Sequence, residues 1–494
     1  MRGSLAQLAA SVAGSRMTRD AAFDSVSTDS RSVLPGALFV ALRGETFDAH
    51  KFLDQVAAKG AAAVVVEELP QGWALPALVV PDTLVALGQL ANAWRRQFAI
   101  PVIGVTGSNG KTTVKEMIAS ILAAEFGADQ RLATQGNLNN EIGVPLTLVR
   151  LEATHRAAVV ELGMNHPGEI GRLAAIAAPT VGLVNNAQRE HQEFMHTVEA
   201  VARENGSVLA ALPPDGVAVY PGDDEYTGLW RAMARCESLT FGLTDDCDVR
   251  ATYTPTGFGS DMTVTTSFPA SAAARREPMP SSQERDVSMD SRGHGNDGQG
   301  EVAATTQAQF TVRLAAAGEH NVRNALAAIA CALAAGIGQD AIVRGLESFA
   351  PVGGRLQRKQ ALCGATVIDD TYNANPDSVR AAIDVLAQYP QPRILVLGDM
   401  GEVGTQGQQF HEEIGAWAKS RGIETVLATG ELARHLASSG AQHFEQFDEL
   451  LAALDTKLGT KSDATVLVKG SRFMKMERVV QHLIGSQNTG KEAH

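Results

Sequence analysis

The residues best suited to chemistry form a glycine-rich turn that ends in Gly-Lys-Thr, at residues 104–113. A loop of this kind holds phosphate, because its backbone N–H groups cradle the β- and γ-phosphates of a nucleoside triphosphate. Lys111 would neutralise phosphate charge, and the hydroxyl of Thr112 would ligate Mg²⁺. We therefore expect ATP with magnesium, bound by Thr106, Gly107, Ser108, Asn109, Gly110, Lys111, Thr112 and Thr113.

The segments on either side of this turn are those that a phosphate loop requires. The apolar run at residues 100–105 predicts a strand, and apolar residues at helical spacing from Val114 to Leu122 predict a helix. The positive end of that helix would face the phosphates. The turn alone leaves the acceptor of the γ-phosphate open: water in a molecular switch, a hydroxyl in a kinase, or a carboxylate in a ligase.

Length and charge narrow the class of protein. A chain of 494 residues is too long for one hydrophobic core and fits about three domains. The net charge of −13 argues against a general binder of nucleic acid, which needs a basic surface. The four cysteines are scattered, and no window approaches the ~20 apolar residues of a membrane span. We therefore expect a cytoplasmic monomer with reduced thiols and no membrane insertion.

The order of the predicted segments indicates an α/β fold with three domains. Residues 1–98 predict a small α/β domain that ends in a helix at residues 84–98. Residues 99–352 predict a central P-loop domain with a mainly parallel, doubly wound sheet, and residues 353–494 predict a Rossmann-like domain. The expected strands are residues 37–41, 62–66, 100–105, 157–162, 181–185, 366–368, 394–397, 425–427 and 465–468. Ligands of such sheets bind at the carboxyl ends of the strands.

One segment interrupts this order, at about residues 267–307. It is rich in Ser, Ala, Gly, Arg, Asp and Glu and has few residues that could form a core. This composition predicts a disordered insertion. We expect a tolerated surface loop there, with a partner-binding segment as the less favoured alternative.

Two polar side chains follow predicted strands of the central domain. Glu161 ends the strand at residues 157–162, and His191 follows the strand that ends at Asn185. Alone, each would be an ordinary polar loop residue. Because neighbouring strands of a parallel sheet end at one edge, their joint placement predicts a metal site that includes Thr112, Glu161 and His191.

A set of ordered motifs carries a resemblance to a known family. Besides GSNGKTT, the chain contains GNLNNEIGVP (136–145), ELGMNHPGEI (161–170), GEHNVRNALAA (318–328), GGRLQ (353–357), DDTYNANPDS (369–378), LGDMGEVG (397–404) and LVKGSRFMKME (467–477). In this order they closely resemble the Mur ligases, over almost the whole chain except the insertion. STDSRSVLPGALFVAL (27–42) and DDTYNANPDS resemble the members that add D-alanyl-D-alanine to a UDP-linked muramoyl tripeptide.

The resemblance implies a reaction and roles for further residues. ATP would phosphorylate the terminal carboxylate of UDP-N-acetylmuramoyl-tripeptide, and the amine of D-alanyl-D-alanine would attack the acyl phosphate. Lys111, His191 and Asn140 would be catalytic. By the same analogy, the nucleotide would also contact Asn321, Arg355 and Asp370, and the substrates would contact Ser30, Arg31, Asn139, Lys469 and Ser471, with Arg472 near the peptide end.

The chain also departs from the family pattern in two places. Ala49 stands in Asp-Ala-His where relatives usually have Asp-Gly-His, so a tight backbone approach there is in doubt. Asn205 aligns with a lysine that relatives carbamylate to help hold a second Mg²⁺, and the chain has no lysine between Lys115 and Lys359. We therefore expect no carbamyl-lysine; the oxygen of Asn205, a bridging water, or Glu190, Glu193 or Glu204 would compensate.

Several alternatives stay open at this point. His191 is a candidate general base, as is the acyl phosphate itself, and the third residue of the tripeptide is either diaminopimelate or lysine. A ligase that adds a single diamino acid, or a folylpolyglutamate-type synthetase, would share the P-loop, but DDTYNANPDS disfavours both. A P-loop nucleotide switch would not explain the presence of the first and third domains, which resemble substrate-binding domains. Division of the nucleotide residues between two domains predicts closure during turnover.

Overall fold

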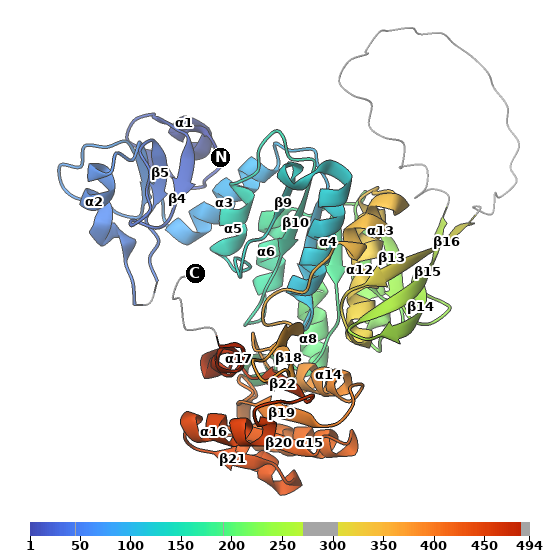
Figure 1. Cartoon of the computed structure of the whole chain (residues 1–494). Coiled ribbons are helices and arrows are strands. Elements are labelled where there is room, and N and C mark those ends of the chain that lie inside the picture. Colours follow the sequence, from blue (N-terminus) through green and yellow to red (C-terminus); the bar gives the residue numbers. More distant parts are fainter. Residues whose placement is uncertain (45, 191, 270–304, 486–494) are drawn as a thin grey trace, which may run out of the picture.

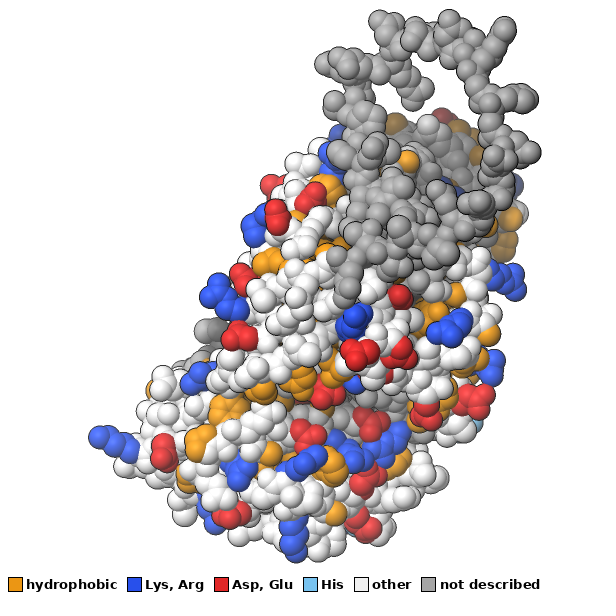
Figure 2. Space-filling view, turned by 90° about the vertical axis from the view of Figure 1, so that its right-hand side faces the viewer, with side chains coloured by type: hydrophobic (Ala, Val, Ile, Leu, Met, Phe, Trp, Pro, Cys, Tyr) orange, Lys and Arg blue, Asp and Glu red, His pale blue; other side chains and the backbone are white. Residues whose placement is uncertain are grey.

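The computed structural model describes residues 1–44, 46–190, 192–269 and 305–485. Figure 1 shows three units that follow one another along the chain, each built around a sheet with helices on its faces. None of the helices in the described ranges combines the length and the hydropathy needed to cross a bilayer. On the face seen in Figure 2, acidic and basic side chains are interspersed, and no large patch of one sign stands out.

The first unit is built on a five-stranded sheet. Its strand order is β2 (Arg16–Met17), β7 (Ala77–Val79), β6 (Ala63–Val66), β5 (Ala37–Val40) and β4 (Ser25–Ser27). β4 to β7 are parallel, and β2 joins β7 antiparallel. The other elements are α1 (Leu5–Ala9), η1 (Ala49–Phe52), α2 (Leu53–Ala58), and the short pair β1 (Gly3–Ser4) and β3 (Ala22–Phe23). β5 and β6 are buried on both faces, as expected for interior parallel strands.

Helix α3 (Thr83–Arg95) joins the first unit to the second. Asp82 caps its start by accepting hydrogen bonds from two backbone N–H groups. Leu87 and Leu90 pack in the core of the first unit, whereas Ala91 packs in the core of the second. The helix therefore holds the two units together through apolar contacts on both of its sides.

The second unit contains a nine-stranded sheet. Its order is β16 (Thr305–Leu314), β15 (Gly259–Pro269), β14 (Val249–Thr256), β13 (Glu237–Gly242), β12 (Val217–Pro221), β11 (Val181–Val184), β8 (Val102–Thr106), β10 (Ala157–Glu161) and β9 (Arg131–Ala133). Strands β8 to β14 are parallel, and β15 and β16 extend the sheet antiparallel. The chain passes from β8 to β9 on one side and later to β11 on the other. The strand order thus reverses around β8, the position at which open α/β sheets bind ligands.

Helices cover both faces of this sheet, and each face has its own core. One core includes residues of α4 (Lys111–Phe126), α12 (Glu319–Ala334) and α13 (Gln339–Glu347). The other includes residues of α5 (Gly143–Leu148), α6 (Glu169–Ala177), α8 (Val198–Asn205), α9 (Ser207–Ala210) and α10 (Thr227–Met233). The short α7 (Gln192–Met195) precedes α8. Burial on both faces explains why the central strands are continuous apolar runs.

The third unit has a six-stranded sheet, seen at the bottom of Figure 1. Its order is β17 (Gln357–Gln360), β18 (Thr366–Asp370), β22 (Thr465–Lys469), β19 (Arg393–Leu397), β20 (Thr425–Thr429) and β21 (Gln442–Phe444), with only β17 antiparallel. The helices are α14 (Pro376–Leu386), α15 (Gly407–Ser420), α16 (Phe447–Leu458) and α17 (Glu477–Ile484), with η3 (Gly404–Gln406), η4 (Ala433–Ser439) and η5 (Arg472–Met474). The helices are divided between two cores, one on each side of the sheet.

The α/β fold class with three sheet-based units is confirmed, and every strand expected from the sequence is present. The predicted limits of the insertion are wrong at both ends. Residues 267–269 belong to β15 and residues 305–307 to β16, and the two strands pair from Ser260 with Leu314 as far as Pro269 with Thr305. Alternation of Thr and Ser with apolar residues favours an edge hairpin, although the composition is polar. Residues 270–304 lie outside the described residues.

Candidate active site

A cleft of about 900 Å³ opens where the second unit meets the third. Its walls include the glycine-rich turn, the segments that follow β10, β11 and β12, the start of α12, and four segments of the third unit. The predicted site residues that line it are Ser108, Asn109, Gly110, Lys111, Thr112, Thr113, Asn139, Asn140, Glu161, Asn321, Arg355, Asp370 and Lys469, together with Arg472. Residues from two sheets and from distant parts of the chain therefore share one cavity.

The glycine-rich turn runs from the end of β8 into α4, as a phosphate loop does. Gly110 has φ of 80° and directly precedes Lys111, the first residue of α4. A Cβ atom at Gly110 would lie 2.4 Å from Oδ1 of Asn324, and one at Gly107 would lie 2.9 Å from Cβ of Asn185. Only glycine fits at both positions, which keeps the turn tight and its N–H groups at the helix start.

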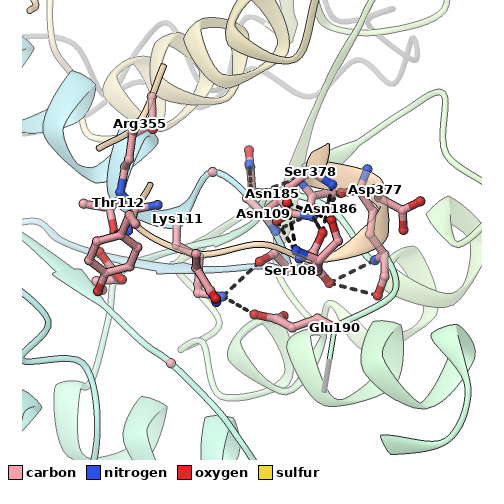
Figure 3. Close-up of a pocket in the computed structure, with 18 of the residues that line it drawn as sticks. Ser108, Asn109, Lys111, Thr112, Asn185, Asn186, Glu190, Arg355, Asp377 and Ser378 are labelled. Carbon is pink, nitrogen blue, oxygen red and sulfur yellow. Dashed lines mark hydrogen bonds and ion pairs between the residues drawn. The ribbon is translucent and has the colours of Figure 1, made fainter. Parts of the chain in front are cut away.

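Lys111 lies inside this turn with its ammonium group held by protein atoms. Nζ donates to the carbonyl oxygen of Gly107 at 2.6 Å and lies 2.8 Å from Oε1 of Glu190. Figure 3 shows Lys111 and Glu190 facing each other below the loop. An incoming phosphate would therefore compete with a carboxylate for the lysine, and binding would exchange one anionic partner for another.

The hydroxyl of Thr112 is contacted by the third unit. Nη2 of Arg355 donates to Oγ1 of Thr112 at 2.9 Å, and the guanidinium of Arg355 also stacks on the ring of Tyr372 at 4.1 Å from its centroid. The stack orients the planar guanidinium of Arg355, which is one of the residues that line the cleft.

Glu161 provides the best test of a metal site. Its side chain is 2% exposed, Oε1 accepts from Nδ2 of Asn139 at 2.9 Å, and Oε2 is buried with no hydrogen-bond partner in the described part of the chain. A buried carboxylate without a counter-charge is costly, and a hard cation would relieve that cost. Thr112 and Glu161 therefore fit Mg²⁺, although no group of three His, Cys, Asp or Glu residues gathers within the described ranges. His191 lies outside them.

Asn205 lies beneath the loop and not in the cleft. It is fully buried at the end of α8, and its Oδ1 accepts from the hydroxyl of Thr106 at 2.5 Å. Thr106 is itself buried and does not line the cleft. The oxygen offered as a metal ligand from sequence is thus engaged in the support of β8.

The carboxylates proposed to compensate are also engaged or distant. Glu204 accepts from the N–H groups of Gly168 and Ile170 and so caps the start of α6. Glu193 is exposed beside Gly404 and does not line the cleft. Glu190 alone of these three lines the cleft, where it pairs with Lys111.

The inner end of the cleft has a different character. Nη1 of Arg323 contacts Oδ1 of Asp223 at 2.8 Å. Burial raises the pKa of Asp223, but hydrogen bonds from Arg323 and from the N–H of Leu243 outweigh it, so this pKa lies below its usual value. Burial raises the pKa of the neighbouring Asp224. The sequence reading missed both aspartates; their position directly after β12 is the signal that could have identified them.

Asn321 and His320, at the start of α12, also line the cleft. Asn321 lies within α12, where its Nδ2 donates to the carbonyl oxygen of Ala317 and its Oδ1 accepts from Asn324. The N-cap of α12 is Gly318, so Asn321 lies within the helix and does not cap it. Removal from water lowers the pKa of His320 to about 4, so its ring is neutral at pH 7.

The predicted substrate residues of the third unit take part in hydrogen bonds and an ion pair that connect its loops. Nζ of Lys469 pairs with Oδ2 of Asp370 at 2.6 Å and donates to the carbonyl oxygen of Asn373. Ser471 is buried, accepts from the N–H of Gly401 and donates to the carbonyl oxygen of Ala374. Ser471 is not among the residues that line the cleft, and it holds the loops behind its wall.

Asn140 and the residues of the first unit complete the set. Oδ1 of Asn140 accepts from the N–H groups of Ile142 and Gly143 and so stabilises the start of α5, while the residue still lines the cleft. Ser30 is buried and Arg31 is exposed, where it pairs with Asp29 at 2.9 Å. Neither Ser30 nor Arg31 reaches the cleft between the second and third units.

Other cleft residues escaped the sequence reading. The segment after β11 contributes Asn185, Asn186, Gln188 and Arg189, and α14 contributes Asn375 and Asp377. Asn109 and Asn375 contact each other across the cleft, with Nδ2 of Asn375 2.9 Å from Oδ1 of Asn109. The sequence shows that polar residues follow the buried strand β11, but it does not show that these residues contact the third unit.

Comparison with known families places this geometry among related proteins. Three family models match consecutive parts of the chain: "Mur ligase family, catalytic domain" at residues 22–95, "Mur ligase middle domain" at residues 105–332, and "Mur ligase, glutamate ligase domain" at residues 354–472. Together they span most of the chain and follow the order of the three sheets.

Individual relatives match almost from end to end. The chain is 37% identical over 481 residues to the UDP-N-acetylmuramoyl-tripeptide–D-alanyl-D-alanine ligase of Escherichia coli (strain K12), covering 97% of this chain and 98% of that protein. The enzyme of the same name from Haemophilus influenzae is 35% identical, with 93% of both chains covered. A crystal structure of MurF from Acinetobacter baumannii superposes with a TM-score of 0.84 at 33% identity, covering 98% of this chain and 99% of that one.

Proposed function

The chain belongs to the Mur ligase family, and we propose that it joins D-alanyl-D-alanine to the terminal carboxylate of UDP-N-acetylmuramoyl-tripeptide at the expense of ATP. The observation that carries the proposal is the cleft, in which a phosphate loop and a buried carboxylate meet the third unit. Relatives of the same length that bear this activity in their names support the choice of substrates. The domain assignment belongs to the proposal: residues 1–98 for the UDP-linked substrate, 99–352 for ATP and 353–494 for the ligase domain.

The reaction begins with activation of a carboxylate, which is a poor electrophile. A carboxylate oxygen of the tripeptide attacks the γ-phosphorus of ATP, ADP leaves, and an acyl phosphate forms. The N–H groups of the loop and Lys111 would hold the phosphates in line and offset their charge, with Arg355 on the opposite side. Lys111 must leave Glu190 to do so.

Amide formation completes the reaction. The amine of D-alanyl-D-alanine attacks the acyl carbon, and the tetrahedral intermediate gives the amide as the C–O bond to phosphate breaks and a proton of the amine passes to the leaving phosphate. Thr112 and Glu161 would hold Mg²⁺, which supplies positive charge to the phosphoryl oxygens. Asn139 orients Glu161 through its 2.9 Å hydrogen bond. We further propose that the chain works in the cytoplasm, where ATP is available, and that it works as a monomer.

The direct test is phosphate release with ATP, Mg²⁺, UDP-muramoyl tripeptide and a panel of D-amino acids and dipeptides. We expect release only when the tripeptide and D-alanyl-D-alanine are both present. Tripeptides with diaminopimelate or lysine at position three would define the natural substrate. Release with a single diamino acid and a dipeptide precursor would favour the other ligase activity, and release without any amine would favour a nucleotide switch.

A further inference from the structure

Three consecutive residues after β11 connect the phosphate loop to the third unit. Gln188 contacts the loop, because its N–H donates to Oγ of Ser108 at 2.9 Å and its Oε1 accepts from Asn109 at 2.5 Å. Glu190 pairs with Lys111 at 2.8 Å. Arg189, between them, reaches across the cleft to the third unit.

Arg189 makes two ion pairs with helices of the third unit. Its Nη2 lies 2.5 Å from Oδ1 of Asp377 in α14, and its Nη1 lies 2.8 Å from Oε2 of Glu413 in α15. The backbone N–H of Arg189 also donates to Oδ2 of Asp377 at 2.9 Å. The guanidinium lies over the ring of Phe410, 5.3 Å from its centroid. Figure 3 shows Asp377 next to the loop residues and linked by dashed lines to the segment that leads to Glu190.

The charges of this cluster balance. Arg380 adds a second guanidinium, 2.8 Å from Oε1 of Glu413, so two cations face two carboxylates. The side chain of Arg189 is 20% exposed, and those of Asp377 and Glu413 are 22% and 32% exposed. A hydrogen bond from Arg189 lowers the pKa of Glu413. The planar guanidinium of Arg189 presents paired donors to both carboxylates at once, whereas the ammonium of a lysine is a point charge without this fork geometry.

The position of Asp377 relates the cluster to the nucleotide site. Asp377 lies in the first turn of α14, whose N-cap, Asn375, contacts Asn109 of the phosphate loop. Arg355 of the same unit reaches Thr112. The ion pairs of Arg189 with the third unit are thus adjacent to the places where residues of that unit contact the phosphate loop.

We propose that Arg189 is a positioning residue that fastens the third domain to the phosphate loop, so that the nucleotide site is assembled from both domains. Arg189 acts through Asp377 and Glu413 and touches no reacting atom. The inference rests on the proposed function only in taking the nucleotide to be ATP. Its test therefore measures nucleotide binding and does not require ligation.

The experiment compares Arg189→Ala, Arg189→Lys and the wild-type chain by calorimetric titration with Mg²⁺ and a non-hydrolysable ATP analogue. We expect Arg189→Ala to weaken binding about tenfold, because loss of the pairs leaves Asp377 and Glu413 without their main counter-charge. Arg189→Lys should recover part of the loss. Affinity for the UDP-linked tripeptide without nucleotide should be unchanged. Arg313→Gln is the matched control: it removes the pair between the exposed Arg313 on β16 and Glu347 at the end of α13, and it should not alter binding.

A double-mutant cycle separates positioning from general stability. Asp377→Asn should weaken binding like Arg189→Ala, and the double variant should be little worse than either single variant. Equal losses of affinity for nucleotide and tripeptide, with a lower thermal midpoint, would overturn the proposal, as would additive effects of the two substitutions. In a further outcome, the wild-type chain binds the analogue and the variants lose affinity as expected, while no amide forms in the ligation assay. In that case the proposed function fails and the role of Arg189 stands.

Discussion

Nη2 of Arg355 lies 2.9 Å from the hydroxyl of Thr112, although 243 positions separate the two residues in the chain. The hydroxyl that would ligate Mg²⁺ is therefore occupied by the third domain in this arrangement. If Mg²⁺ took the hydroxyl, Arg355 would lose this partner but could keep its stack on Tyr372. Its guanidinium would then offer positive charge to the phosphates.

The first prediction concerns Arg355. Arg355→Ala should lower kcat/KM for ATP about 100-fold, because a preorganised donor to the phosphates is lost. Arg355→Lys should restore only part of it, since an ammonium cannot stack and donate as a planar group does. Steady-state kinetics with ATP varied at saturating tripeptide and dipeptide measure the effect. An unchanged kcat/KM in both variants would remove Arg355 from the nucleotide site.

The contact between Arg355 and Thr112 also shows what could be predicted from sequence. The phosphate loop was readable because its residues are contiguous, and strand, turn and helix are each determined by local spacing. Glu161 was readable because parallel strands end at one edge of a sheet. These features depend on the order of residues along the chain and on the period of the structure they adopt.

Contacts between domains could not be read in this way. Arg189 and Asp377 are 188 positions apart, and no local pattern marks either as a partner of the other. Asn205 shows a different limit of sequence-based prediction. Its residue type suited a metal ligand, but in the fold its Oδ1 accepts a hydrogen bond from the hydroxyl of Thr106 at the end of β8. The direction of a side chain at the end of a helix depends on tertiary packing, and sequence motifs carry no information about that packing.

The second prediction concerns the unpartnered oxygen of Glu161. Glu161→Gln keeps the shape and the contact with Asn139 but removes the charge, so ligation should fall about 100-fold. In EDTA the variant should unfold at the same temperature as the wild type or a higher one, because an uncompensated buried charge is gone. Added Mg²⁺ should raise the thermal midpoint of the wild type only. A similar rise in the variant would mean that the metal binds elsewhere.

The third prediction is a loss of stability in mild acid. His411 is fully buried in α15, where Nε2 accepts from the N–H of Met400 at 3.1 Å, and burial lowers its pKa below the ordinary 6.5. Below pH 6.5 His411 becomes protonated in the unfolded chain before it becomes protonated in the folded chain. This contribution to stability is therefore complete above that pH and declines as the pH falls, by at most about 1.4 kcal/mol per pH unit.

Urea unfolding between pH 7 and pH 5 measures this slope. His411→Gln should show a shallower dependence on pH, by up to one proton, whatever its stability at pH 7. The comparison of slopes separates protonation from packing, because a packing defect shifts the curve without changing its pH dependence. An identical slope in the two proteins would contradict the assignment.

The last prediction concerns carbon dioxide. The family resemblance implies a carbamylated lysine at the position where this chain has Asn205, and an amide side chain cannot form a carbamate. Asn205 is fully buried and accepts a hydrogen bond from Thr106, so a small movement of its side chain would not bring it to a metal ion in the cleft. Ligation by the wild-type chain should therefore be equal in carbonate-free buffer and with added bicarbonate. A strong dependence on bicarbonate would contradict this expectation and point to another carbamylated group.

Substitutions at Asn205 extend the same test. Asn205→Ala removes the acceptor of the Thr106 hydroxyl and should cost about 1–3 kcal/mol of unfolding free energy, measured in urea. Asn205→Lys places an ammonium group in a fully buried position and should cost more in the absence of CO₂. If bicarbonate restored both stability and ligation to Asn205→Lys, the buried site would be able to accept a carbamate. If it restored neither, the surroundings of Asn205, and not the residue alone, would exclude that way of holding a second metal ion.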